Sequence, residues 1–369
     1  PTPTPTPSPT PTATPTATAT PSPTPTGRVL HVDVVNGSDD TGDGLSPATA
    51  WRTLTHALGL AQAGDLFLVA PGLYENQLSV PVTTPNVTIR GTGQPGDVRI
   101  SPIDPLAAGI KVNGAAGVTL ENLWIHGGRR GILAVGATDG LVVRDVVITA
   151  SSQNGIRVLK GNGVTIERTT ITGVATHAIF TSKTHGVQLR DDLLYANQGS
   201  GLRIARSEAD VAFCTIYSNG SGVRVIKSAL ALRDSIVANH GAGPGIFIQN
   251  TGVEPVAISF SLLFANNPDV APPTTPLGFG MILGQPPGFV SDAGGIDPDG
   301  ADGILGGTAA NPDGWKDDVL LLQQVRGGQT VQSPAVDNGS DTVETLGITG
   351  STAVGGAPDI LQADMGAHR

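Results

Sequence analysis

A short apolar phrase recurs along the middle of the chain at nearly constant spacing. It begins with Gly or Ala and continues with alternating apolar residues, at 109–112, 131–134, 155–158, 178–181, 201–204, 222–225 and 245–248. Successive copies are 22, 24, 23, 23, 21 and 23 residues apart. Repetition at this period is typical of a solenoid, in which each repeat buries its apolar side against its neighbours.

A second short apolar run follows each phrase after about nine residues, as at 118–120, 142–144, 164–166 and 187–189. Two or three short strands per repeat, without helical spacing between them, predict strands that stack in parallel at about 4.8 Å per coil. The repeat lacks the Leu-Asn register of leucine-rich repeats and has no amphipathic helix. The expected fold class is therefore all-β, a parallel β-helix.

Asparagine closes the same turn in four coils, at Asn197, Asn219, Asn239 and Asn266. Stacked turn asparagines can hydrogen-bond along the axis and tolerate left-handed backbone. We interpret all four as structural.

The ends of the repeat region differ from its middle. After residues 46–47, the positions Trp51, Leu54, Leu58 and Ala61 fit one face of a helix, which we expect to cap the N-terminal end of the solenoid. We assign the β-helix to residues 27–270 and a loop-rich capping region that continues it to 271–369. The apolar residues in the Pro-rich stretch 271–290 either cap the last coil or contact another subunit.

Residues 1–26 contain only Pro, Thr, Ser and Ala. This composition predicts an extended polyproline II stalk, either a plain spacer or an O-glycosylated stalk. The candidate glycosylation sites are its hydroxyl residues: Thr2, Thr4, Thr6, Ser8, Thr10, Thr12, Thr14, Thr16, Thr18, Thr20, Ser22, Thr24 and Thr26.

The phrase ladder, the asparagine turns and the opening at 32–39 and 51–54 resemble the pectin-lyase-like family of right-handed parallel β-helices, in particular secreted bacterial members. The segments 333–337 and 364–367 look like the ending of surface-anchored β-helix proteins. The resemblance implies a right-handed β-helix and an extracellular location, secreted or on the cell surface. It does not select an activity, because the family includes lyases, hydrolases, adhesins and structural proteins.

Charge and cysteine content narrow the function classes. With 21 Lys and Arg against 31 Asp and Glu, the net charge of −10 argues against nucleic-acid binding. Cys214 is the only cysteine, so no intramolecular disulfide is expected. The sequence contains no run of about 18 apolar residues, so we expect no membrane-spanning helix.

The ladder offers no complete catalytic set. Family hydrolases place an Asp pair beside a histidine motif, but here the coil after Asp191 and Asp192 has Phe213 and Cys214 at the matching place. We interpret the Asp pair as a solvated cluster with Arg190, and we assign no catalytic residue.

Basic residues instead recur in register along the ladder: Arg157, Lys160, Lys183, Arg203, Arg206, Arg224 and Lys227. Such a strip could bind an acidic polysaccharide; alternatively, its cations are solvated and neutralised by neighbours such as Glu208 and Asp210. A lyase would need one of them, Arg203 or Lys183, as a base beside bound calcium.

Three further sets of residues are candidates. Asp297, Asp299 and Asp302 form either a calcium loop or a polar turn. We expect His126, His177 and His185 at surfaces or turns, since they lack metal-ligand spacing. Tyr195, Tyr217 and Phe264 form an outward column that either stacks on sugars or packs on an adjacent loop.

Our main functional expectation is a non-catalytic extracellular structural or surface protein that self-associates head to tail into a filament. The alternatives are a lyase-like enzyme, or an adhesin without turnover, that binds an acidic polysaccharide through the basic strip. Calcium is the one cofactor that the sequence suggests.

Overall fold

A computed structural model describes residues 27–76, 79–241, 243–250, 254–290, 305–306, 313–316, 318, 320–324, 331–348, 350–353 and 362–368. The stalk, its candidate glycosylation sites and the candidate calcium residues Asp297, Asp299 and Asp302 lie outside these ranges. Among the described residues, no helix is long and apolar enough to cross a membrane.

The described strands form three parallel sheets, which we call sheets A, B and C. Sheet A contains β1 (Val29–Val32), β2 (Leu66–Val69), β5 (Thr88–Gly91), β8 (Thr119–Glu121), β11 (Val142–Arg144), β14 (Thr165–Glu167), β17 (Val187–Arg190), β20 (Glu208–Ala212), β23 (Ala229–Arg233) and β26 (Val256–Ser259). Sheet B contains β3 (Gly72–Asn76), β6 (Val98–Pro102), β9 (Trp124–His126), β12 (Val147–Thr149), β15 (Thr170–Thr172), β18 (Leu193–Tyr195), β21 (Thr215–Tyr217), β24 (Ile236–Ala238), β27 (Leu262–Phe264) and β29 (Ile282–Leu283). Sheet C contains β4 (Val80–Val82), β7 (Ala108–Asn113), β10 (Arg130–Val135), β13 (Ile156–Leu159), β16 (Ile179–Ser182), β19 (Ser200–Ala205), β22 (Ser221–Ile226), β25 (Ile246–Gln249) and β28 (Val270–Ala271).

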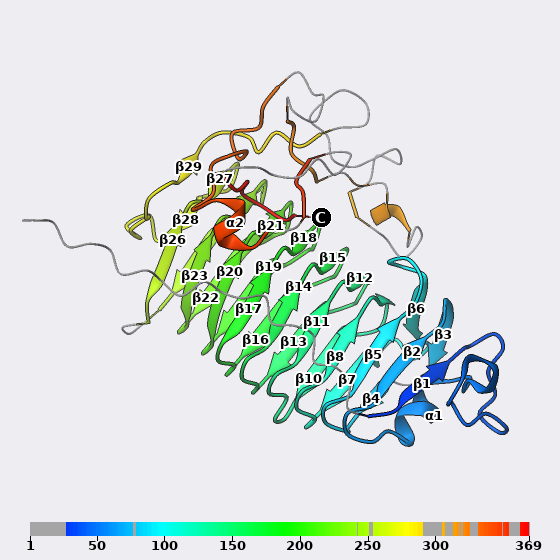
Figure 1. Ribbon diagram of the computed structural model, residues 1–369. Coiled ribbons are helices and arrows are strands. Elements are labelled where there is room, and N and C mark those ends of the chain that lie inside the picture. Colours follow the sequence, from blue (N-terminus) through cyan, green and yellow to red (C-terminus); the bar gives the residue numbers. More distant parts are fainter. Residues whose placement is uncertain are drawn as a thin grey trace, which may run out of the picture.

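Each coil supplies one strand to sheet C, then one to sheet A and one to sheet B, and the coils stack along one axis (Figure 1). The prediction of a parallel β-helix is therefore confirmed. The recurring phrase is the sheet C strand, and its apolar residues line the interior, as do Ile132, Ile156 and Ile179 in successive coils.

Packing favours glycine at the start of the phrase, although Ala178 takes this place in one coil. A Cβ on Gly131 or Gly155 would collide with the side chain of Ile148 or Ile171, the buried isoleucines of strands β12 and β15. The chain turns from sheet A to sheet B at one left-handed residue per coil, such as Asp145 (φ 53°).

The asparagine column is present, but one of its members differs from the sequence expectation. The side chains of Asn197 and Asn219 accept hydrogen bonds from the backbone N–H one coil below, at 3.1 and 3.0 Å. In the next coil this place is taken by His240, whose Nδ1 accepts from Asn219 N at 3.0 Å. Asn239 instead has left-handed backbone (φ 60°) and donates to the hydroxyl of Tyr217.

Two short helices flank the first coil. They are η1 (Pro47–Thr49) and α1 (Leu54–Gly59), and Thr53 caps α1 by accepting from His56 N at 3.2 Å. Leu54, Ala57 and Leu58 are buried in the main core, which they join beside β4. That α1 seals this end of the solenoid stays a prediction.

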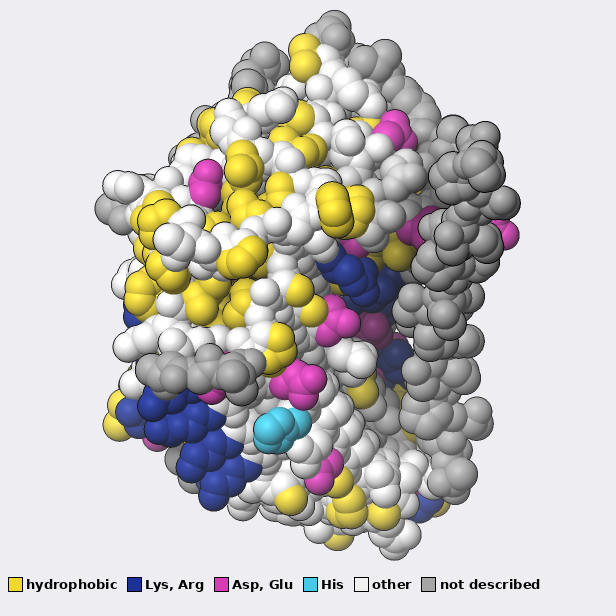
Figure 2. All heavy atoms as spheres, turned by 90° about the vertical axis from the view of Figure 1, so that its left-hand side faces the viewer, with side chains coloured by type: hydrophobic (Ala, Val, Ile, Leu, Met, Phe, Trp, Pro, Cys, Tyr) yellow, Lys and Arg dark blue, Asp and Glu magenta, His cyan; other side chains and the backbone are white. Residues whose placement is uncertain are grey.

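At the other end, part of the Pro-rich stretch packs on the last coil. Leu277 and Met281 lie against the main core, and Gly278 N donates to Ile258 O at 2.7 Å. Phe279 is 88% exposed. This end of the molecule faces the viewer in Figure 2, where hydrophobic side chains cover much of the upper half.

The C-terminal residues form a strap across the outside of the coils. The described part includes η2 (Gly314–Lys316) and α2 (Val343–Leu346). The two ending-like segments meet each other, since Asp337 N donates to Asp364 at 2.7 Å and Met365 N to Ala335 O at 2.9 Å. That residues 271–369 form a separate capping region stays a prediction.

The strap also corrects the expectation for the Asp pair. Asp192 is fully buried and accepts from Thr169 N at 2.9 Å, so it is not solvated. Asp191 contacts Arg190 and the buried His368, at 3.6 and 3.2 Å. Asp191 is therefore part of the attachment of the strap, whereas Asp192 is bonded within the coils.

Candidate anion-binding face

One outward column of sheet C contains three arginines without an ion pair among the described residues. The pairing register aligns Arg157, Phe180, Arg203, Arg224 and Phe247 on five successive strands, β13 to β25. Strand stacking places neighbours in such a column about 4.8 Å apart. The alignment expected from the sequence is therefore present, with two phenylalanines among the arginines.

A second column of cations borders the first. Each of the strands β13, β16, β19 and β22 is followed by an exposed basic residue with left-handed backbone: Lys160, Lys183, Arg206 and Lys227, with φ of 63°, 56°, 50° and 49°. This shared conformation turns the chain out of sheet C at the same place in every coil. All seven predicted cations thus lie on one face.

The phenylalanine rings order the arginines beside them. The guanidinium carbons of Arg157 and Arg203 each lie 5.3 Å from the centre of the Phe180 ring, and that of Arg224 lies 4.9 Å from the centre of Phe247. Cation–π contacts of this kind hold a guanidinium in place without neutralising its charge. The guanidinium groups are therefore ordered by the rings and keep their charge.

No carboxylate neutralises these cations within the part of the chain that the structure describes. The salt bridges found there include none of the seven, and Glu208 and Asp210 do not pair with them. The Nε atoms of Arg157, Arg203 and Arg224 are buried and have no hydrogen-bond partner there. The described residues thus show no neutralising carboxylate, while Lys160, Lys183, Arg206 and Lys227 are exposed to solvent.

Neighbouring positive charges act on one another. The pKa of Arg203 is lowered by partial burial and by Arg224, and the pKa of Arg130, on β10, is lowered by burial, Arg157 and Arg129. An arginine stays charged despite such shifts. The face therefore contains an unrelieved repulsion that a bound anion would reduce.

His177, expected only as a turn residue, lies within this face. Its Nδ1 accepts from Ser200 N at 3.1 Å, and its Nε2 lies 3.1 Å from Nη1 of Arg203. Burial, Arg203 and Arg224 lower its pKa to about 4, so the ring is neutral at pH 7. Because a neutral ring that accepts at Nδ1 carries its proton on Nε2, two N–H donors face each other.

That arrangement calls for an acceptor. Two donors cannot satisfy each other, whereas one oxygen of an anion lying beside both would accept from Nε2 of His177 and from Nη1 of Arg203. Phe180 and Phe247 could have been found from the sequence, because they occupy the same place in the phrase as the arginines. His177 could not, since it lies in a turn outside the phrase.

The column continues to a groove at the N-terminal end of sheet C. Pro81 and Lys111 precede Leu133 and Arg157 in the same outward register. They line a cavity of about 700 Å³, together with Glu75 and Asp104. The face thus extends from an open basic strip to a groove that carries both charge signs.

The other candidate residues have structural partners. Tyr195 is buried and donates to Asp318 at 2.8 Å, and the ring of Tyr217 packs on Phe289 at 5.1 Å. Phe264 is half-buried against the same hydrophobic cluster, so this column packs on later segments of the chain. His126 is hydrogen-bonded to Thr149, while His185 is exposed. The described residues contain no cluster of three or more His, Cys, Asp or Glu that could hold a metal.

Lys and Arg side chains are not spread evenly over the surface. On the end face of the solenoid, they gather mainly in one patch on the lower half, apart from the hydrophobic side chains above (Figure 2). This clustering occurs in a chain whose net charge is −10.

Comparisons with known proteins agree on the fold. Residues 108–262 match the family described as "Right handed beta helix region". Among curated protein sequences no match is found.

Among solved structures, pectate lyase Pel9A matches with a TM-score of 0.61 and 14% identity, over 93% of this chain and 96% of that one. The A-module of mannuronan C-5 epimerase AlgE4 from Azotobacter vinelandii matches with a TM-score of 0.46 and 18% identity, over 68% of this chain and 76% of that one. GH136 lacto-N-biosidase from Eubacterium ramulus matches with a TM-score of 0.38 and 11% identity, over 70% and 68%. The family match and the likeness to Pel9A together identify the chain as a right-handed parallel β-helix with a pectate lyase-like fold.

Proposed function

We propose that this protein binds an acidic polysaccharide along the outward face of sheet C. The observation that carries the proposal is the register of Arg157, Arg203 and Arg224 on a face where the described residues provide no ion-pair partner. Guanidinium groups bind carboxylates and sulfates through two parallel hydrogen bonds. A polymer with regularly spaced acidic groups suits a column with regularly spaced arginines.

The phenylalanines support a sugar as the unit that carries these acidic groups. A pyranose ring has an apolar face that can lie on an aromatic ring, while its acidic group reaches an arginine in the neighbouring coil. Phe180 lies between Arg157 and Arg203, and Phe247 lies beyond Arg224. The lysine column at the border would add attraction without fixed geometry, because an ammonium binds as a point charge.

Binding without turnover fits this face better than lyase chemistry. A lyase needs a base that removes a proton beside the bound carboxylate. The acceptor nitrogen of His177 is already used by Ser200 N, and its other nitrogen carries the proton. We therefore do not assign His177 as the base. An enzyme, which would have to use Arg203 or Lys183 instead, ranks second, and its support is the fold shared with pectate lyase Pel9A.

An extracellular location, secreted or on the cell surface, completes the proposal. It rests on the Pro/Thr stalk and on the resemblance of the opening and ending segments. Assembly into a filament, O-glycosylation and a calcium site at Asp297, Asp299 and Asp302 remain proposals of lower rank.

The test is a titration with galacturonate oligosaccharides followed by calorimetry, with dextran oligosaccharides of equal length as the uncharged control. We expect saturable binding of the acidic ligand only, and a loss of about tenfold or more in affinity for Arg203→Ala, because one charge-assisted contact contributes about 1.5–3 kcal/mol. The matched control is Arg144→Ala, on sheet A. The proposal is wrong if Arg203→Ala binds as tightly as the unmodified protein.

An assay for turnover separates the enzyme alternative. Ultraviolet absorbance of unsaturated uronate products, measured with the same oligosaccharides, should stay flat. A steady rise that disappears in Arg203→Ala would make the protein a lyase.

A further inference from the structure

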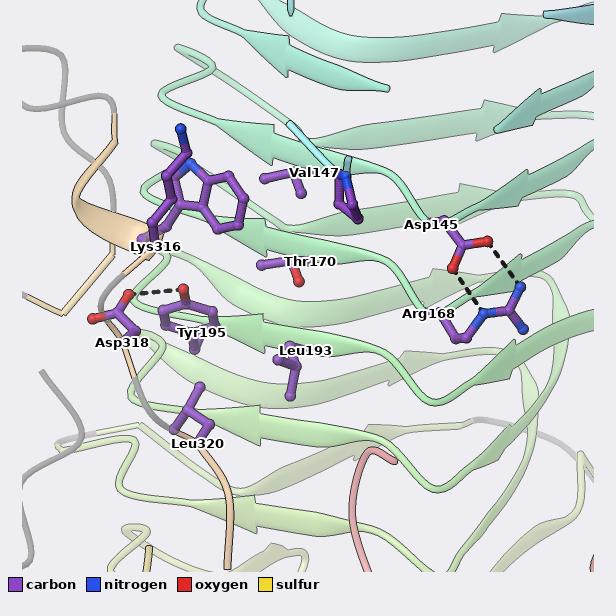
Figure 3. A pocket seen from close by; sticks show the side chains of 11 residues that line it. Asp145, Val147, Arg168, Thr170, Leu193, Tyr195, Lys316, Asp318 and Leu320 are labelled. Atoms are coloured by element: carbon purple, nitrogen blue, oxygen red, sulfur yellow. Dashed lines mark hydrogen bonds and ion pairs between the residues drawn. The ribbon is translucent and has the colours of Figure 1, made fainter. Parts of the chain in front are cut away.

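A small cavity lies away from the basic face of sheet C, between sheet B and the strap. It has a volume of about 280 Å³. Its floor is the outward column of Val147, Thr170 and Leu193, which are in register on β12, β15 and β18. Figure 3 shows these three side chains between Asp145 and Arg168 on one side and Lys316 and Asp318 on the other.

Aromatic and apolar groups make up most of the lining. Tyr195, Trp315, Leu320 and Pro95 line the cavity besides the apolar floor residues. Trp315 is fixed by an edge contact with Trp124, at 5.9 Å between ring centres. The strap contributes Trp315 and Leu320, so the cavity exists only where the C-terminal residues pack on sheet B.

The charged groups around the cavity are already paired with one another. Arg168 holds Asp145 through two hydrogen bonds of 2.8 and 2.9 Å. Lys316 pairs with Asp313 at 2.7 Å, and Asp318 accepts from Tyr195 at 2.8 Å. A charged ligand would have to displace these partners, so the cavity favours an uncharged, largely apolar occupant.

Aromatic-lined hollows of this kind suit proline-rich chains. A polyproline II segment is already extended in the free state, loses little entropy on binding and presents its rings to aromatic side chains. This chain contains such a segment, because residues 1–26 have no charged residue and alternate proline with small residues for much of their length.

The segment starts close enough to reach the cavity. Gly27 is held on the first coil, where its N–H donates to Gly64 O at 3.2 Å and the next residue, Arg28, pairs with Asp65. From β1 to β14, beside the cavity, there are five steps in sheet A, or about 24 Å along the axis. Twenty-six residues of polyproline II span about 80 Å.

We propose that the cavity between sheet B and the strap is a docking site for the chain's own Pro/Thr segment. Covalent attachment gives the segment a high effective concentration at the cavity, so a small apolar contact suffices. This inference is independent of the polysaccharide face, which lies on sheet C, and either can fail without the other.

The test uses the full chain with its three tryptophans replaced by 5-fluorotryptophan, so that fluorine NMR gives one signal each for Trp51, Trp124 and Trp315. A nitroxide is attached at Thr14→Cys, while Cys214 stays unlabelled because it is fully buried. We expect the label to broaden the Trp315 and Trp124 signals strongly and Trp51, at the first coil, weakly. A free segment would instead broaden Trp51 at least as much as Trp315.

A filled cavity provides the matched control. Leu193→Phe should reduce the broadening of Trp315 to the level of Trp51, whereas Leu133→Phe, at an outward position of sheet C, should leave it unchanged. Broadening that survives Leu193→Phe overturns the proposal.

Mixing separates the chain's own segment from that of a second copy. Fluorinated chains without the label are combined with labelled chains without fluorine. Signals that stay sharp in this mixture support docking within one chain. Broadening of Trp315 in the mixture would assign the site to a second copy and overturn the proposal as stated.

Discussion

Two outward columns of the same solenoid contain arginines at similar density, but only one of them also contains carboxylates that pair with the arginines. On sheet A, the residues Arg90, Glu121, Arg144 and Glu167 are in register on β5 to β14. Their side chains pair along the axis at 2.8, 3.5 and 3.7 Å. On sheet C, phenylalanine or another arginine occupies the places where sheet A has glutamate.

The difference shows what decides the role of a charge in a repeat protein. The scaffold repeats the same geometry in every coil, so the residue one coil away determines whether an arginine is used internally or is offered to a ligand. Like charges directly opposite each other in a sheet are destabilising, as Arg203 and Arg224 are. Such a column on sheet C is explained better by a ligand than by stability.

The largest effect should come from building the sheet A pattern into sheet C. Phe180→Glu places a carboxylate between Arg157 and Arg203. We expect affinity for galacturonate oligosaccharides to fall about 100-fold, because two arginines gain an internal partner and the ligand meets a like charge. Thermal stability should stay equal or rise. Phe180→Leu, which removes only the ring, should weaken binding less; an equal loss in both variants would contradict the charge argument.

The inward asparagine column contains His240 and should therefore make the stability of the protein depend on pH. The pKa of His240 is lowered to about 4, chiefly by burial, from a value near 6.5 when unfolded. The folded state therefore favours the neutral ring, and stability is lost as pH falls from about 6.5 towards 4. His240→Asn should remove about 2 kcal/mol of that loss at pH 5 and change little at pH 7.5.

Urea denaturation of both proteins at the two pH values measures this difference. Asn250→Asp, at another coil end, controls for a general effect of altered charge. Equal pH dependence with and without His240 would show that the ring is not the titrating group.

A smaller effect is expected from opening the sheet A ladder. Glu167→Gln removes a carboxylate partner of Arg144 and should lower the free energy of unfolding by about 1 kcal/mol or less. Binding of galacturonate oligosaccharides should not change. A tenfold change in affinity would mean that the two columns are not independent.

The smallest effect should come from the lysine border. Lys183→Ala should weaken polysaccharide binding two- to threefold at low salt, and hardly at all at 0.5 M salt, since exposed charges are screened. Lys316→Ala, at the strap, is the matched lysine control. A large loss that persists at high salt would move the site from the arginines to this border.

The fold could be predicted well from the sequence because the same short pattern of residues recurs in successive coils. The Gly-apolar phrase sets the sheet C strand, and its period sets the register that aligns Arg157 with Arg203 and Arg224. Features that depend on contacts between distant segments could not be predicted. His177 reaches Arg203 from a turn, and Asp191 contacts His368 of the strap, 177 positions away in the sequence.

The departure of Asn239 from the column has a different origin, a shift of one residue. The phrase that ends in Asn197, Asn219 and Asn266 ends one residue early in that coil, and His240 takes over the place in the column. Alignment by residue type selected the asparagine, whereas the hydrogen-bond geometry selected the next residue. An acceptor on a side chain of suitable length is what the position requires, and histidine supplies one only while it is neutral.

The strap changes how the solenoid should unfold. In a simple repeat array each coil contacts only its neighbours, so the end coils can fray one at a time. Here Arg190 donates to Leu346 O at 2.7 Å, Asp234 accepts from Ser340 N at 2.6 Å, and His368 contacts Asp191. These bonds join coils to residues more than 100 positions away in sequence, so the C-terminal coils should open together, as one cooperative unit.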